Sequence, residues 1–113
     1  MTETGRQDYT AIYGMIHAFS VQRKREQAWL IKRDYADIHV TIHYPEYADR
    51  FIIYRREQEK PYRLIREFFP ADIEQGNFSY TDAFIDSDIS YTYKLEALNS
   101  AKTVIATSGD QTI

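Results

Sequence analysis

Residues 78–99 read FSYTDAFIDSDISYTYKLEALN, and the second half of this segment alternates between apolar and polar side chains. One side of an extended chain carries Tyr91, Tyr93, Leu95 and Ala97. A period of two is typical of a half-buried β-strand rather than a helix. Residues 78–85 are aromatic and contain threonine, and the DSD turn at 86–88 consists of residues that bond their own backbone. The segment therefore predicts two strands joined by a short polar corner.

These two strands resemble strands E and F of a fibronectin type III domain. In that family an apolar residue, a short turn and a tyrosine open strand F, which then runs Tyr-x-apolar-x-apolar-x-Ala-apolar-Asn. Ile85, Tyr91 and Asn99 match this spacing. The resemblance covers roughly residues 35–108 and implies an all-β, immunoglobulin-like sandwich of about seven antiparallel strands. It also implies that Tyr91 is a corner tyrosine whose hydroxyl is tied to nearby backbone.

Other alternating segments supply further strands. Residues 34–44 correspond to strand B, where the family usually carries a buried tryptophan and this chain has Ile42. Residues 51–56 resemble strand C, residues 62–69 form strand C′ with an ambiguous register, and residues 103–107 form the last strand. The side chains expected to point into the core from strands B and C are Ile38, Val40, Ile42, Tyr44, Phe51 and Ile53.

The N-terminal third is less clear. Between residues 11 and 21 the apolar positions fit a helical stripe, yet residues 15–22 fit a first strand equally well, and periodicity leaves both open. The resemblance favours the strand. The charged run RKRE at 23–26 predicts a solvated turn, because its few cations are insufficient for multi-phosphate binding to a polyanion. Trp29, the one tryptophan, has apolar neighbours and is predicted to plug the core; a ligand-stacking platform is the alternative.

The composition is that of one soluble globular domain. The 113 residues divide into a flexible tail at 1–8, a domain at 9–108 and a linker or tail at 109–113. The 14 basic and 17 acidic residues give a net charge of -3, so neither nucleic acid nor an anionic membrane is expected as a partner. No apolar run approaches the length of a membrane span, and no membrane insertion is expected.

The chain has no cysteine, which excludes disulfides and thiolate metal sites. This fits a cytoplasmic protein, although many extracellular type III modules also lack cysteine. We expect an extracellular or cell-envelope location if the chain is part of a longer protein, and a cytoplasmic location otherwise.

Candidate chemistry is sparse. His39 and His43 would lie about 13 Å apart on a strand, so they cannot share a metal ion, and His17 would have to approach one of them. Calcium at Asp82, Asp86 and Asp88 is conceivable, with backbone capping at the turn as the alternative. Gly-rich phosphate loops and nucleophile elbows are missing from the sequence. We expect no catalytic residue, no metal and no cofactor.

The outer face of the expected C-C′-F-G sheet is a better candidate for a functional site. Ile52 and Tyr54 are predicted to point away from the core and, with Tyr62 or Leu64, to form an apolar patch that holds a partner domain. Ordinary cross-strand pairs on an exposed sheet are the alternative.

These expectations together describe a non-catalytic protein-interaction or spacer module of a larger extracellular or cell-surface protein. Its partner would be another protein or a neighbouring domain of the same chain. The alternative function is an accessory carbohydrate-binding domain of a secreted enzyme, in which exposed rings such as Tyr44, Tyr47 and Tyr62 stack against sugars.

Overall fold

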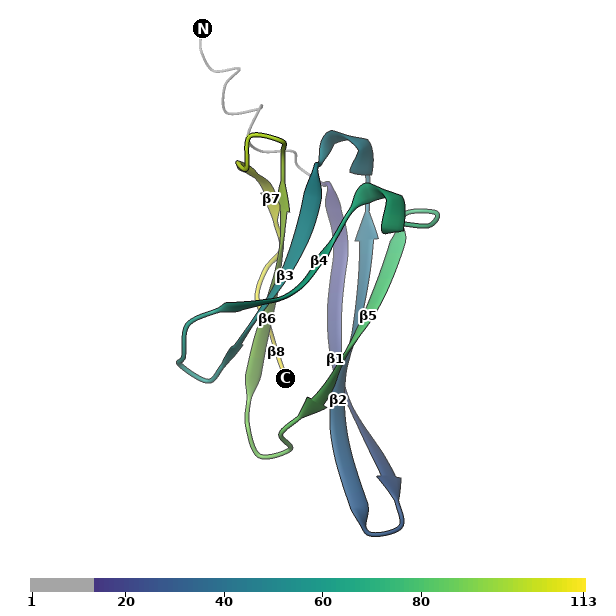
Figure 1. Cartoon of the computed structure of the whole chain (residues 1–113), viewed down its shortest axis with the longest axis vertical. Coiled ribbons are helices and arrows are strands. Elements are labelled where there is room, and N and C mark those ends of the chain that lie inside the picture. Colours follow the sequence, from purple (N-terminus) through teal and green to yellow (C-terminus); the bar gives the residue numbers. More distant parts are fainter. Residues whose placement is uncertain (1–13) are drawn as a thin grey trace, which may run out of the picture.

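The computed structural model describes residues 14–113, and these form two antiparallel β-sheets (Figure 1). The first sheet has the order β1-β2-β5, with bounds β1 (Ile16–Ala28), β2 (Ile31–Ile42) and β5 (Asn77–Ile85). The second has the order β4-β3-β6-β7, with bounds β3 (Arg50–Glu57), β4 (Arg63–Phe68), β6 (Tyr91–Leu98) and β7 (Val104–Thr107). A short strand, β8 (Gln111–Thr112), also pairs with β6, and two 3-10 turns are η1 (Pro45–Tyr47) and η2 (Pro70–Asp72).

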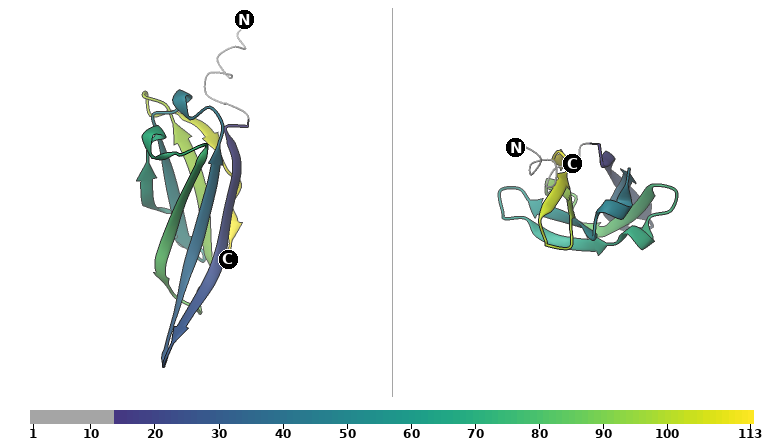
Figure 2. Two further views of the ribbon diagram at one scale, coloured as in Figure 1. Left: turned by 90° about the vertical axis from the view of Figure 1, so that its right-hand side faces the viewer. Right: turned by 90° about the horizontal axis from the view of Figure 1, so that it is seen from above.

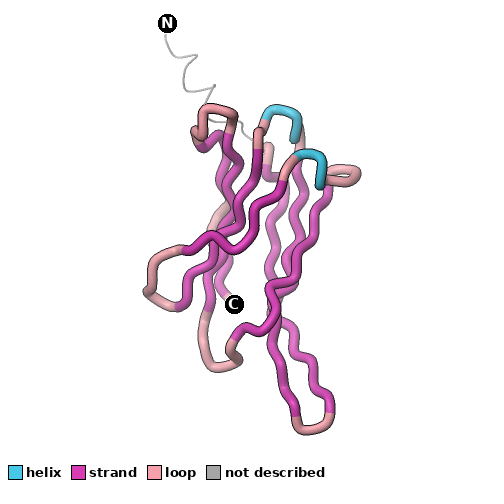
Figure 3. Tube along the Cα trace, in the orientation of Figure 1, coloured by secondary structure: helices cyan, strands magenta, loops and turns pink. Residues whose placement is uncertain are grey.

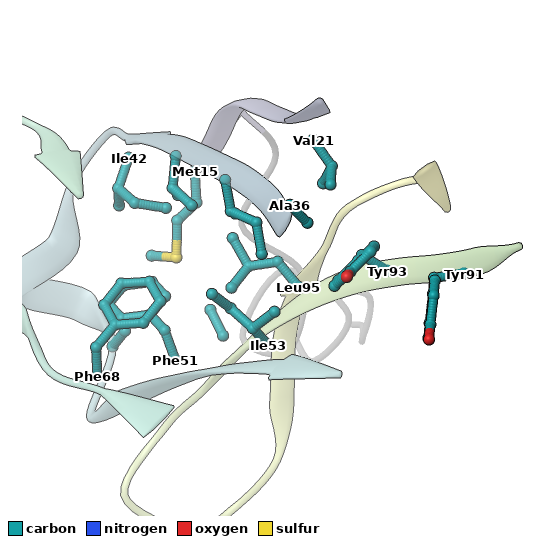
Figure 4. Close-up of a cluster of buried hydrophobic side chains, with 14 of the residues drawn as sticks. Met15, Val21, Ala36, Ile42, Phe51, Ile53, Phe68, Tyr91, Tyr93 and Leu95 are labelled. Atoms are coloured by element: carbon teal, nitrogen blue, oxygen red, sulfur yellow. The ribbon is translucent and has the colours of Figure 1, made fainter. Parts of the chain in front are cut away.

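The two sheets face one another across a shared apolar core, as in a β-sandwich (Figures 2 and 4). On β6 the inward residues Tyr93 and Leu95 are fully buried, as the period-two pattern predicts. The all-β prediction with layered sheets is therefore confirmed. Both sheets contribute to the core, whose buried members include Val21, Ala36, Ile38, Val40, Ile42, Phe51, Ile53, Phe68, Ala97 and Ile105.

A stack of three phenylalanine rings links the sheets at one side. The Phe68 ring on β4 lies 5.0 Å from Phe51 on β3 and 3.9 Å from Phe78 on β5, measured between ring centroids. The Arg66 guanidinium then covers the Phe78 and Tyr80 rings at 5.6 and 5.5 Å. Stacked rings under a cation keep water away from this side of the core.

Tyr91 ties the corner between β5 and β6. The backbone N–H of Asp86 donates a hydrogen bond of 2.8 Å to the Tyr91 hydroxyl, and the Tyr91 side chain is buried. The same corner is shaped by Asp86, whose carboxylate accepts the backbone N–H of Asp88 at 2.9 Å. The phenol therefore satisfies a donor that the turn would otherwise leave unpaired.

Over the described residues, the helical alternative for residues 11–21 is wrong, because β1 begins at Ile16 and pairs with β2 over its whole length. The alternation of residues 15–22 predicts His17 on the same side of the strand as Phe19 and Val21, but a register shift lies between Ile16 and Ala18, and His17 is exposed. The expected tail at 1–8 lies outside the described residues.

The first hairpin differs most from expectation. The run at 23–26 lies within β1 rather than in a turn, and two further residue pairs follow it before the hairpin turns at Trp29 and Leu30 (Figure 3). The predicted core plug is wrong: Trp29 is 95% exposed at the tip of the hairpin. Trp29 adopts a φ of 58°, a conformation for which such turns usually have glycine. Because this turn contains no glycine, the sequence gives no indication of a turn there.

The C-terminal segment and Tyr44 also depart from expectation. Residues 111–112, expected to be part of a linker or tail, form β8 against β6, which gives eight strands in residues 14–113. Ile113 exchanges backbone hydrogen bonds with Tyr91. Tyr44, expected on the inner side of strand B, has φ 59° and is 56% exposed, because the chain leaves the strand after Ile42 and enters η1.

Candidate functional site

The outer face of the second sheet gathers two tyrosines around one lysine. The Lys94 ammonium lies 5.3 Å from the centroid of the Tyr54 ring and 4.5 Å from that of Tyr62. Arg56 covers the Tyr62 ring at 5.1 Å, and Leu64 is opposite Tyr54 in the β3–β4 register. We call Tyr54, Tyr62, Leu64 and Lys94 the tyrosine–lysine face. Three strands position it, since β3, β4 and β6 each contribute a side chain.

Burial and neighbouring carboxylates hold both phenols in the neutral form. Burial raises the pKa of Tyr54, and Glu96 raises it further. Burial also raises the pKa of Tyr62, and the Asp110 carboxylate adds to this effect. Lys94 in turn lies 3.6 Å from the Glu96 carboxylate. At neutral pH the face therefore presents uncharged rings beside one paired cation, a combination suited to binding rather than to proton transfer.

Accessibility divides the four residues of the predicted patch. Leu64 is 54% exposed, and Tyr54 and Tyr62 are half-buried. Ile52 points away from the core, but it is only 5% exposed and faces Glu67 and Glu96 across the neighbouring strands. The expectation that Ile52 is an exposed part of the patch is therefore wrong. The alternation identified its side of the sheet, but long polar neighbours cover it.

Sequence reasoning missed Lys94 and Arg56 as parts of this face. Their signal is the cross-strand register: Tyr54 is directly opposite Lys94, and Arg56 is opposite Thr92. That pairing follows from the alignment of β3 with β6, which periodicity within one strand does not contain.

Two of the three aspartates of the suggested calcium turn, Asp82 and Asp86, form hydrogen bonds within the fold. Asp82 is buried, and its Oδ2 accepts hydrogen bonds from the Tyr93 hydroxyl at 2.6 Å and from Arg55 at 2.8 Å. Burial and the bond to Asp82 raise the pKa of Tyr93 far above its usual value, so the phenol stays a donor. Within residues 14–113 no three acidic or histidine side chains converge as metal ligands.

A second buried carboxylate, that of Asp34, belongs to β2 in the first hairpin. Asp34 accepts from Arg25 Nε at 2.8 Å and from Arg23 Nη1 at 2.9 Å. The hydrogen bond from Arg25 lowers the pKa of Asp34, and the bond from Arg23 adds to this effect. Arg23 also donates to the Ile89 carbonyl at 2.7 Å, so it joins the hairpin to the β5–β6 corner. The charged run at 23–26 thus has a structural role.

Two of the three histidines lie in one row with two exposed tyrosines, and the third histidine lies elsewhere. His17 stacks on His43 at 4.5 Å, and His43 meets Tyr44 edge-on at 6.1 Å. Tyr44 then faces Tyr47 at 6.2 Å, and both tyrosines are more than half exposed. We call these four rings the aromatic row. His39 lies apart, beside Ser79 and Asp37.

Tyr62 is not part of the aromatic row. Tyr44 and Tyr47 precede β3, whereas Tyr62 follows its other end. The strand therefore separates them by roughly 25 Å at about 3.3 Å per residue. Of the three rings expected to stack sugars, the structure brings two together.

The described residues contain no helix long and apolar enough to cross a membrane. Two hollows lie on the described surface. One, of about 110 Å³, is lined by Arg55, Glu57, Lys60, Pro61 and Arg63. It lies at the β3–β4 turn and not on the tyrosine–lysine face.

No protein-family model matches the chain, and no curated protein matches its sequence. Among solved structures, the chain is similar to pectate lyase PelI from Erwinia chrysanthemi, determined in complex with tetragalacturonic acid. The TM-score is 0.48 and the sequence identity 17%; the match covers 82% of this chain and 28% of that one. The chain therefore spans little more than a quarter of that protein, and a likeness this remote assigns neither family nor activity.

Proposed function

We propose that this chain is a non-catalytic, fibronectin type III-like module that binds another protein or a neighbouring domain through the tyrosine–lysine face. The observation that carries the proposal is the clamp of Tyr54 and Tyr62 around Lys94, next to the exposed Leu64. Such a surface combines rigid rings, one accessible aliphatic side chain and charges that are already paired. Interfaces are enriched in tyrosine, because an aromatic anchor loses little side-chain entropy on binding.

The sheet topology supports the type III-like part of the proposal. The orders β1-β2-β5 and β4-β3-β6-β7 correspond to strands A-B-E and C′-C-F-G of such a module. The hydrogen bond from the Asp86 N–H to the Tyr91 hydroxyl has the position and partner of a tyrosine corner. Sandwich folds host unrelated functions, so the topology does not support protein binding. That part of the proposal rests on the tyrosine–lysine face alone.

Site-specific photo-crosslinking in the full-length gene product tests this function. A benzophenone side chain at position 64 samples the face, and the same group at the exposed Gln22, on the other sheet, is the matched control. We expect a discrete crosslink to a protein or to another domain from position 64 alone. Equal crosslinking from both positions, or none from either, would contradict the proposal.

A loss-of-contact variant complements the crosslink. Leu64→Ser removes the exposed aliphatic side chain without opening the core, and Val104→Ser is a control of similar exposure on β7. If the partner is a second copy of the chain, sedimentation velocity over a concentration series shows weaker association for Leu64→Ser. Association unaffected by Leu64→Ser excludes the second copy as the occupant of this face.

The aromatic row favours carbohydrate binding as a second candidate function. Tyr44 and Tyr47 are exposed, and their ring centroids are 6.2 Å apart, so two rings can contact one extended ligand. Glycan-array binding that is lost in Tyr47→Ala and retained in Leu64→Ser would support this candidate. Binding that survives Tyr47→Ala would exclude the row as the sugar site.

A further inference from the structure

The tip of the first hairpin exposes two large apolar side chains. Pairing of β2 with β5 ends at Asp34, which is opposite Arg25 on β1, so residues 25–34 form a two-stranded ribbon that projects beyond the rest of the molecule (Figures 1 and 2). Trp29 and Leu30 occupy its turn and are 95% and 96% exposed. Among the other large apolar side chains whose exposure the structure describes, the next is Phe84 at 73%.

The backbone at the tip makes this choice of residues costly. Trp29 has φ 58°, a region that glycine adopts readily and a bulky side chain does not. A turn selected for stability alone would carry glycine or asparagine at this position. An exposed tryptophan in a strained position indicates a use outside the folded domain.

Charge on the ribbon has the opposite sign to the rest of the chain. Residues 25–34 carry three basic and two acidic side chains, whereas the whole chain has 14 basic and 17 acidic. The remaining residues therefore hold 11 basic and 15 acidic side chains. The overall charge of -3 conceals this asymmetry, and the ribbon is the end of the molecule that an anionic surface attracts.

We propose that the projecting ribbon docks end-on into the interface of an anionic lipid membrane. Trp29 and Leu30 enter the boundary between headgroups and acyl chains, where the amphipathic indole is favoured. Lys32 and Arg33 follow at roughly 7 and 10 Å behind Leu30, at about 3.3 Å per residue. Interfacial elements insert about 5–10 Å deep, so these cations lie at the level of the lipid phosphates.

A protein occupant fits the tip less well. One aromatic side chain buries about 150–250 Å², so two tip residues offer far less than the roughly 1,000 Å² that a specific protein interface requires. A membrane can accept these side chains without a complementary pocket. The basic residues behind the tip increase the affinity of the ribbon for an anionic membrane. This site is separate from the tyrosine–lysine face and does not depend on the proposed function.

Intrinsic fluorescence tests the docking directly, because Trp29 is the one tryptophan in the chain. The probes are phosphatidylcholine vesicles with and without phosphatidylserine, titrated into the intact protein. We expect a blue shift of Trp29 emission, quenching by lipids brominated on the acyl chain, and cosedimentation, each with the anionic vesicles. Raising the salt concentration should weaken all three, since surface charges are screened.

Three variants separate the contributions. Trp29→Gly suits the turn and should lower vesicle affinity roughly tenfold in cosedimentation, because the largest inserted side chain is lost. Lys32→Glu should reduce affinity for anionic vesicles and leave the weak binding to neutral vesicles unchanged. Leu64→Ser, on the tyrosine–lysine face, should bind vesicles like the parent protein.

Several results would overturn the proposal. One is Trp29 emission unchanged by anionic vesicles at low salt; another is vesicle binding in which aqueous acrylamide still quenches Trp29 fully. A blue shift that grows with protein concentration without lipid would assign the tip to a second copy. A response to single-stranded DNA but not to vesicles would assign the ribbon to nucleic acid.

Discussion

Strands β1 and β2 run through two different environments, and the same alternation serves different purposes in each. Inside the sandwich the inward residues are apolar, and Val21 on β1 is opposite the fully buried Ile38 on β2. In the projecting ribbon the same side of the hairpin carries Arg25 opposite Asp34. The alternation continues along both strands, but the second sheet faces only the part of the hairpin that lies inside the sandwich. Burial therefore stabilises one half of the hairpin, and charge pairs and strand pairing stabilise the other.

Arg23 marks the boundary between the two halves. It donates to Asp34 on the ribbon and to the Ile89 carbonyl at the β5–β6 corner, so it links both environments. The end of the β1–β2 hairpin extends past the second sheet (Figure 1). The contrast implies that stability resides in the sandwich and that the ribbon is free to contact other molecules.

The largest expected effect comes from truncating a core residue of β2. Ile38→Ala should lower the free energy of unfolding by about 2–5 kcal/mol, because it removes fully buried methyl groups and leaves a cavity. Lys32→Ala, on the exposed part of the same strand, should change it by no more than about 0.5 kcal/mol. Urea unfolding measures both. Similar losses in the two variants would mean that the ribbon is as tightly packed as the sandwich.

A smaller loss is expected at the buried Asp82. Asp82→Ala leaves the Tyr93 hydroxyl without its acceptor in the core and should cost about 2–3 kcal/mol. Arg55 is partly exposed and can turn towards water, which limits the penalty. Asp82→Asn retains an acceptor oxygen for Tyr93 and should lose less in the same urea experiment. If the asparagine variant is as unstable as the alanine variant, the charge of Asp82 matters more than its hydrogen bond to Tyr93.

The second buried carboxylate predicts a response to acid. Arg25 and Arg23 lower the pKa of Asp34 in the folded protein below its ordinary value of 3.8. The charged pair therefore stabilises the fold above that value, and the contribution is lost as pH falls through the lowered folded pKa. Asp34→Asn should be less stable than the parent at neutral pH, and the difference should narrow in acid. A difference that stays constant with pH would contradict the assigned role.

The period-two signal explains how much of the fold was predictable. Tyr93 and Leu95 could be predicted as core residues, because strict alternation of apolar and polar residues indicates which side of a strand is buried. The turn at Asp86–Asp88 could be predicted because aspartate and serine side chains bond nearby backbone groups. Trp29 was misread because an apolar turn without glycine resembles a buried strand. The two-residue strand β8 is too short to have a pattern of its own.

The candidate site was predictable only in part, since it depends on register between strands. Alternation placed Tyr54 on the outer side, but the approach of Lys94 to both rings follows from the alignment of β3 with β6. Ile52 shows the converse limit: its direction was predictable, while its cover by longer neighbours was not. Sequence periodicity indicates where a side chain points, and tertiary structure decides what it meets.

The smallest expected change is at the tip of the ribbon, where it separates stability from function. Trp29→Gly removes the largest side chain of the turn, yet that side chain is 95% exposed and contributes little burial. Glycine also relieves the positive φ, which offsets its greater freedom in the unfolded chain. The free energy of unfolding should therefore stay within about 0.5 kcal/mol of the parent in urea. A clear loss would mean that Trp29 packs against the protein in solution, and it would then be unable to reach a membrane.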